Sequence, residues 1–135
     1  MNTIGLALMS IGILMYGVIP LIADFNRTHA SNPRWPKHAR FHVVTQVLTT
    51  SSIALIALWF LWSPNVERNL GICIAAVLSF AVTGSFFVSA GFRNSYGGAL
   101  NDAEGGIRKF RRIDLNAVNF GVSAVLVLVG RLTLL

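Results

Sequence analysis

The chain has 135 residues, of which 12% are charged and 54% are hydrophobic, and its formal net charge is +6. The charged share is about half that of an ordinary soluble domain, which argues against a water-soluble globule and against a disordered tail. Cys73 is the single cysteine, which excludes a scaffold held by internal disulfides. The length allows one domain, so the composition predicts a single membrane domain over residues 1–135.

Four apolar stretches follow one another along the chain. They predict helices over about residues 4–25, 36–62, 69–92 and 114–134. Each stretch has on the order of twenty residues, which is the length that a helix needs to cross a hydrocarbon core. None of them alternates as a membrane strand does, and backbone groups in lipid must pair within their own segment. The sequence therefore predicts an all-α integral membrane four-helix bundle.

The basic side chains are concentrated in two of the three connections. The first connection and the start of the second helix carry Arg27, Arg34, Lys37 and Arg40, and the third connection carries Arg93, Arg108, Lys109, Arg111 and Arg112. The opposite side has only Arg68 and Arg131. Because cytoplasmic loops are enriched in Lys and Arg, we expect both basic connections in the cytoplasm and both termini on the non-cytoplasmic side. The basic residues, including a collar at residues 108–112, are expected to meet anionic lipid headgroups rather than nucleic acid.

Polar side chains gather at the same predicted end of the bundle. Pro36 suits a first helical turn, which places His38 and His42 one turn apart on one face. Thr45 and Thr49 continue that face, and Gln46 is adjacent to it. Since polar groups in a membrane helix usually face the bundle interior or a wet cavity, this face predicts a pocket that opens to the cytoplasm.

The first and last helices contribute further polar groups at this level. Tyr16 and Asp24 share a face of the first helix, and Asp114 precedes Asn116 and Asn119 on the last one. We therefore expect a pocket between the first, second and fourth helices that binds a lipophilic or amphiphilic small molecule. In this interpretation Tyr16, Thr45, Gln46, Thr49, Asn116 and Asn119 contact the ligand.

Three chemical interpretations of the histidines stay open. In the first, His38 and His42 act as acid and base in proton transfer, with Asp24 and Asp114 tuning them. In the second, the pair holds a metal ion with His29 or Asp24 as a third ligand, although the sequence has no metalloprotease motif and our preferred assignment contains no metal. In the third, the polar groups only hold the helices together. The sequence names no cofactor, substrate or oligomeric state.

A family resemblance adds to this interpretation. The stretch Pro36-Lys37-His38-Ala39-Arg40-Phe41-His42 resembles the signature of a group of small, uncharacterised bacterial four-helix membrane proteins, and the region from Asn101-Asp102 to Asp114-Leu115-Asn116 is similar as well. The resemblance implies a multi-pass protein of the bacterial inner (plasma) membrane, and it implies no activity. In layout the chain also resembles DoxX-like membrane proteins and small multidrug exporters, but its first helix lacks the mid-membrane glutamate of those exporters.

Two further expectations concern partners. A bundle this small buries little surface by itself, so a homodimer is compatible with the sequence. The alternative to a ligand-binding or catalytic protein is a non-catalytic accessory or assembly subunit of a larger membrane complex. In that case the polar face of the second helix would contact another chain.

Overall fold

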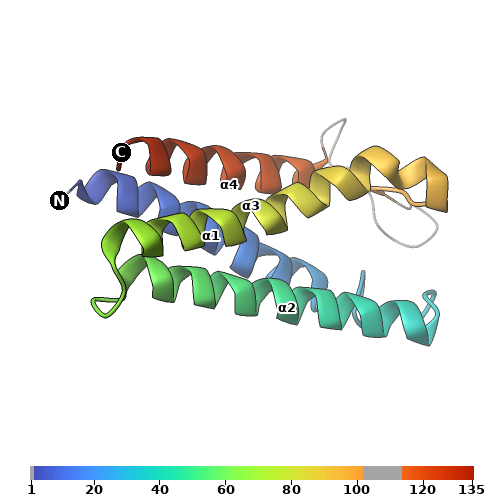
Figure 1. Cartoon of the computed structure of the whole chain (residues 1–135). Coiled ribbons are helices and arrows are strands. Elements are labelled where there is room, and N and C mark those ends of the chain that lie inside the picture. Colours follow the sequence, from blue (N-terminus) through green and yellow to red (C-terminus); the bar gives the residue numbers. More distant parts are fainter. Residues whose placement is uncertain (1, 102–113) are drawn as a thin grey trace.

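The computed structural model describes residues 2–101 and 114–135, and these residues form four α-helices. They are α1 (Thr3–Asp24), α2 (Lys37–Trp62), α3 (Arg68–Phe92) and α4 (Leu115–Leu132), and the short 3-10 helix η1 (Arg93–Tyr96) extends α3 (Figure 1). No strand occurs in these two described ranges. The expected all-α four-helix fold is confirmed, and the helix bounds differ by at most two residues from the expected ones.

All four helices are long and apolar enough to cross a membrane. The 22 residues of α1, for example, extend over about 33 Å, close to the thickness of a hydrocarbon core. The helices run antiparallel in sequence order, so both chain termini lie together at one end of the bundle (Figure 1). Asn2 fastens them there, because its Nδ2 donates a hydrogen bond of 2.7 Å to the carbonyl of Thr133.

We call the opposite end the basic end. It contains the C-termini of α1 and α3 and the N-termini of α2 and α4. The basic residues located there in the structure are Arg27, Arg34, Lys37, Arg40 and Arg93. The expected basic collar at residues 108–112, and most of the stretch that contributed to the family resemblance near Asp114, lie outside the described residues.

Helix α1 is the centre of the bundle and contacts the other three helices. Its side chains Leu6, Met9, Ile13 and Tyr16 recur every three or four residues and are fully buried. This one-sided burial follows from the helical period, since residues three and four apart lie on the same face. The core of the bundle is therefore built around one face of α1.

Helices α1 and α4 approach each other most closely. A Cβ atom at Gly12 would lie 2.8 Å from the carbonyl oxygen of Ser123, and one at Gly130 would lie 2.7 Å from that of Gly5. Only glycine fits at such distances from a neighbouring backbone, and small residues at helix interfaces permit this packing in membranes. Ser123 Oγ also donates a hydrogen bond of 2.6 Å to the Gly12 carbonyl.

Polar groups cap the ends of the helices. The Glu67 carboxylate accepts hydrogen bonds from the amides of Asn69 and Leu70 at the start of α3, as expected for an N-cap. Arg68 donates to the carbonyl of Leu61 in the last turn of α2, at 2.7 Å. The Arg68 contact holds α2 and α3 together at their short connection, and the two helices separate toward the basic end (Figure 1).

Candidate functional site

A cavity of about 470 Å³ lies between α2 and α3 in the half of the bundle near the basic end. Its wall combines polar and apolar side chains. They are Gln46, Thr50 and Ile53 of α2, Ala81, Val82, Ser85, Phe86 and Ser89 of α3, and Phe120 of α4. The cavity exists because α2 is poorly covered along its length: its buried residues are Val47, Ala54, Ala57 and Leu61.

A smaller cavity of about 100 Å³ continues toward α1 and α4. It shares Gln46, Thr50, Phe86 and Phe120 with the larger one and adds Pro20, Asp24, Val47 and Asn116. Two aromatic rings form the common wall, because Phe86 and Phe120 stack with centroids 4.5 Å apart and an angle of 13° between the ring planes. We refer to the two cavities together as the basic-end cavity.

Asp24 is the ionisable group among the residues that line the basic-end cavity. Its Oδ1 lies 3.7 Å from Nδ1 of His29, and the two side chains are 24% and 19% exposed. Thr28 Oγ1 lies 2.8 Å from the same His29 nitrogen. Because Thr28 already donates its hydroxyl proton to Asn26 Oδ1, at 2.6 Å, it accepts from His29. The neutral imidazole therefore carries its proton on Nδ1, between Thr28 and Asp24.

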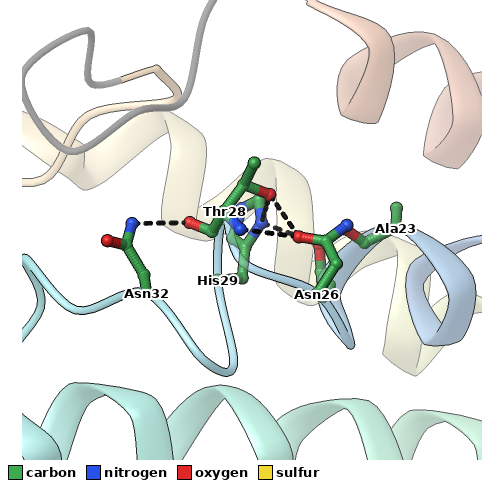
Figure 2. Close-up of polar contacts among 6 residues, drawn as sticks. Ala23, Asn26, Thr28, His29 and Asn32 are labelled. Carbon is green, nitrogen blue, oxygen red and sulfur yellow. Dashed lines mark hydrogen bonds and ion pairs between the residues drawn. The ribbon is translucent and has the colours of Figure 1, made fainter.

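Local side-chain hydrogen bonds shape the loop after α1, as Figure 2 shows, and this loop places His29 beside Asp24. Asn26 Nδ2 donates to the carbonyl of Ala23 at 2.6 Å, and Asn26 Oδ1 accepts from the amide of Thr28 at 2.7 Å. Asn32, which is 1% exposed, donates to the carbonyl of Thr28 at 2.8 Å. Such Asn-centred turns offer the backbone an alternative to continuing the helix. The loop thus folds back against the end of α1.

Of the predicted site residues, the structure brings Asp24, Gln46 and Asn116 together at the basic-end cavity. His38 and His42 lie on the exposed part of α2 and line neither cavity. Their Nε2 atoms are 2.9 Å apart, so the two rings hydrogen-bond to each other. Their proposed role in proton transfer stays a prediction, and the carboxylate beside the cavity has His29 as its imidazole partner instead.

The remaining predicted residues lie in other environments. Thr45 and Thr49 are exposed on α2, and the Thr45 hydroxyl donates to the carbonyl of Phe41. Asp114 caps α4 by accepting from the amide of Ala117 at 2.9 Å. This bond explains its position without a role in the cavity.

Tyr16 and Asn119 are buried deeper in the bundle. The Tyr16 hydroxyl lies 3.3 Å from Ser79 Oγ. Asn119 is 6% exposed, and neither its Nδ2 nor its Oδ1 has a hydrogen-bond partner among the described residues. A buried carboxamide in this state is destabilising unless something else pairs with it. Asn119 lines neither cavity, but its unpaired carboxamide makes it a second candidate for contact with a bound molecule.

Among the polar residues of the cavity wall, the sequence analysis did not assign Thr50, Ser85 or Ser89 to the site. A signal for each was present, because Thr50 lies four residues after Gln46, and Ser85 lies four residues before Ser89. Residues four apart share a helix face, so each pair forms a short polar strip on α2 or α3. These strips, rather than the face with Thr45 and Thr49, border the cavity.

The described part of the chain contains no group of three His, Cys, Asp or Glu side chains that could hold a metal ion. Neither His29 nor Asp24 therefore joins His38 and His42 as a third ligand.

No curated protein and no solved structure is significantly similar to the chain. Residues 8–130 match a protein family that is described as a family of unknown function, DUF6640. This match covers all four helices apart from the first residues of α1 and the last of α4. The four-helix layout with the cavity at its basic end is thus the structure of a chain that belongs to the DUF6640 family.

Proposed function

We propose that this protein is a multi-pass membrane protein that binds an amphiphilic small molecule in the basic-end cavity. The surface supports the membrane part of the proposal. Large apolar side chains are exposed on all four helices, among them Ile22, Leu55, Val77 and Val125. Soluble monomers rarely expose apolar patches that continue around the whole molecule, whereas contact with lipid requires them.

The charge distribution supports an orientation. The basic connections lie in the cytoplasm and both termini lie on the other side, because Lys and Arg are concentrated at one end of the bundle. We propose the bacterial inner membrane as its location, and the resemblance of the Pro36–His42 stretch to small bacterial membrane proteins supports this proposal. A cysteine introduced at Thr28, in a Cys73→Ser background, tests the orientation: a membrane-impermeant thiol reagent should leave it unlabelled in intact cells and label it in inverted vesicles. Labelling in intact cells would contradict this orientation.

One observation carries the binding proposal: a cavity of about 470 Å³ with both polar and aromatic walls in a chain of this size. Small-molecule sites typically measure 300–1,000 Å³ and are mostly apolar, with a few placed polar groups. Here Phe86, Phe120 and Ile53 supply apolar contact, and Gln46, Thr50 and Ser89 supply hydrogen-bonding groups. The ligand is therefore an apolar molecule with a polar group that faces the basic end.

The smaller cavity supports a chemical role for Asp24. A hydroxyl or amine of the ligand would donate to its carboxylate, and the imidazole of His29, with Nδ1 3.7 Å from Asp24 Oδ1, would lie beside it as a second acid–base group. A carboxylate and an imidazole in contact can take up and release a proton near neutral pH. Acid–base conversion of the ligand at this pair is the catalytic form of the proposal.

Filling the cavity tests the binding proposal. Thr50→Trp places an indole in the cavity, and Thr49→Trp places the same side chain on the exposed neighbouring position as a matched control. Native mass spectrometry of the protein purified in mild detergent should detect a bound molecule with the wild type and with Thr49→Trp. It should detect none with Thr50→Trp, which should retain the helical circular dichroism of the wild type. Equal retention by both variants, or a wild type without a bound molecule, would contradict the proposal.

A second function, an accessory subunit of a larger membrane complex, is supported by the exposed hydroxyls of Thr45, Thr49 and Ser52 on α2. Polar side chains on membrane helices often contact another helix. In that case Thr49→Trp, rather than Thr50→Trp, would release a defined protein that copurifies from the native membrane with the tagged chain. Release of that protein by both variants or by neither would contradict this second function.

A further inference from the structure

The pair of histidines at the start of α2 is the strongest cluster of metal-ligating atoms outside the basic-end cavity. His38 Nε2 and His42 Nε2 lie 2.9 Å apart. The two ring planes are nearly perpendicular, with their centroids 4.3 Å apart. In the neutral pair, one Nε2 atom donates its proton to the other. Both rings therefore direct an Nε2 atom, which is a potential metal ligand, toward the same point.

We infer that His38 and His42 form a binding site for a divalent transition-metal ion of the copper or nickel type. Imidazole is a preferred ligand for such ions, and two histidines four residues apart on a helix present their rings on the same face. For both rings to bind the metal through Nε2, the proton that lies between them moves through solvent to Nδ1 of its own ring, so both histidines ligate as neutral imidazoles and no proton is released. No change of oxidation state is involved.

The spacing of the nitrogens favours one coordination geometry. With metal–nitrogen bonds of about 2.05 Å, nitrogens 2.9 Å apart subtend an angle of about 90° at the metal. This is the angle between neighbouring ligands in a square-planar or octahedral complex, which Cu²⁺ and Ni²⁺ adopt. Tetrahedral Zn²⁺ would need the nitrogens about 3.3 Å apart. The pair is therefore expected to bind Cu²⁺ most tightly and Ni²⁺ more tightly than Zn²⁺.

The position of the pair fits an open site. Both side chains are exposed, so an ion can enter from outside the bundle and water can complete its coordination. Among the described residues no third His, Cys, Asp or Glu joins the two histidines. The pair also lines neither part of the basic-end cavity, so this inference is independent of the proposed ligand site.

Metal titration of the full chain tests the inference. The protein is purified through a tag without histidine, and Cu²⁺, Ni²⁺ and Zn²⁺ are each titrated by isothermal calorimetry. One Cu²⁺ per chain should bind, with electron paramagnetic resonance showing nitrogen ligands. His38→Gln and His42→Gln should each weaken Cu²⁺ binding by at least about tenfold, because a single imidazole loses the chelate. His29→Gln is the matched control and should leave the affinity unchanged.

Three results would overturn the inference. The first is unchanged Cu²⁺ affinity in the variant that combines His38→Gln with His42→Gln, which would place the ion elsewhere. The second is an equal loss of affinity in His29→Gln. The third is tighter binding of Zn²⁺ than of Ni²⁺, which would exclude the geometry set by the nitrogen spacing. Circular dichroism of each variant checks that α2 is still folded.

Discussion

Ser123 donates its hydroxyl proton to the carbonyl oxygen of Gly12 across 2.6 Å, and this bond joins residues 111 positions apart in the chain. It fixes the register between α1 and α4, the first and last helices. One turn farther toward the basic end, the same register brings Asn119 level with Tyr16. The level of Asn119 relative to the cavity therefore depends on this contact between the two helices.

A side chain at Gly12 should separate α1 from α4. The Cβ atom of Gly12→Ala would lie 2.8 Å from the Ser123 carbonyl oxygen, which is backbone and moves only with its helix. We expect the free energy of unfolding to fall by about 1–3 kcal/mol, as for other overpacked sites. Gly84→Ala is the control, since its Cβ atom has nothing within 4 Å, and it should be neutral or stabilising. Unfolding in mixed micelles measures both, and equal loss in the two variants would contradict close packing at Gly12.

The hydroxyls of Tyr16 in α1 and Ser79 in α3 form a buried pair, and removing one should lower the free energy of unfolding more than removing the other. Ser79 Oγ donates to the carbonyl of Ala75 at 2.7 Å, so the Tyr16 hydroxyl is the donor in the contact between them. Ser79→Ala leaves the Tyr16 hydroxyl buried without its acceptor and should lower the free energy of unfolding by about 1–3 kcal/mol. Tyr16→Phe removes that donor and should lower it by about 1 kcal/mol or less. The reverse order of the two losses would show that this hydrogen bond does not hold the tyrosine.

Replacing Asn119 should raise the thermal stability of the ligand-free protein and weaken its retention of the bound molecule. Asn119→Leu keeps a similar volume and removes a buried carboxamide without partners, so the midpoint of thermal unfolding of the ligand-free protein should rise. Retention of the bound molecule, measured by native mass spectrometry, should fall if the carboxamide pairs with that molecule. Ser123→Ala is the comparison, because it breaks the hydrogen bond to Gly12 and should lower the midpoint. A lower midpoint in Asn119→Leu would show that the carboxamide stabilises the bundle.

The Glu67 carboxylate that caps α3 should make the stability of the fold depend on pH in the acidic range. Hydrogen bonds from the backbone amides of Asn69 and Leu70 lower the pKa of the Glu67 carboxyl from its ordinary value of 4.5. A carboxyl with a lowered folded-state pKa stabilises the fold fully above its unfolded-state pKa, and it loses this contribution as the pH falls through the folded-state value. The stability difference between the wild type and Glu67→Gln should therefore be constant near neutral pH and shrink below about pH 4.5. Thermal unfolding across this range measures it, and a difference that grows on acidification would contradict the assignment.

The sequence alone determined the number, length and type of the helices and the end at which the basic residues gather. Hydropathy over about twenty residues and the absence of strand alternation are local properties, and they do not depend on how the helices pack. Local chemistry also predicted the start of α2, because Pro36 lacks an amide and suits the first turn of a helix.

Only the tertiary structure decided which polar side chains share a site. Gln46 and Thr49 both lie on α2, yet one borders the cavity and the other faces outward, because the direction in which α2 leans away from α3 depends on contacts distant in sequence. In the same way Asp24 meets His29 rather than His42, since the loop after α1 folds back through the hydrogen bonds of Asn26. Helical spacing tells which residues share a face, but the face that meets a neighbouring helix is set by packing, as at the glycine contacts of α1 with α4.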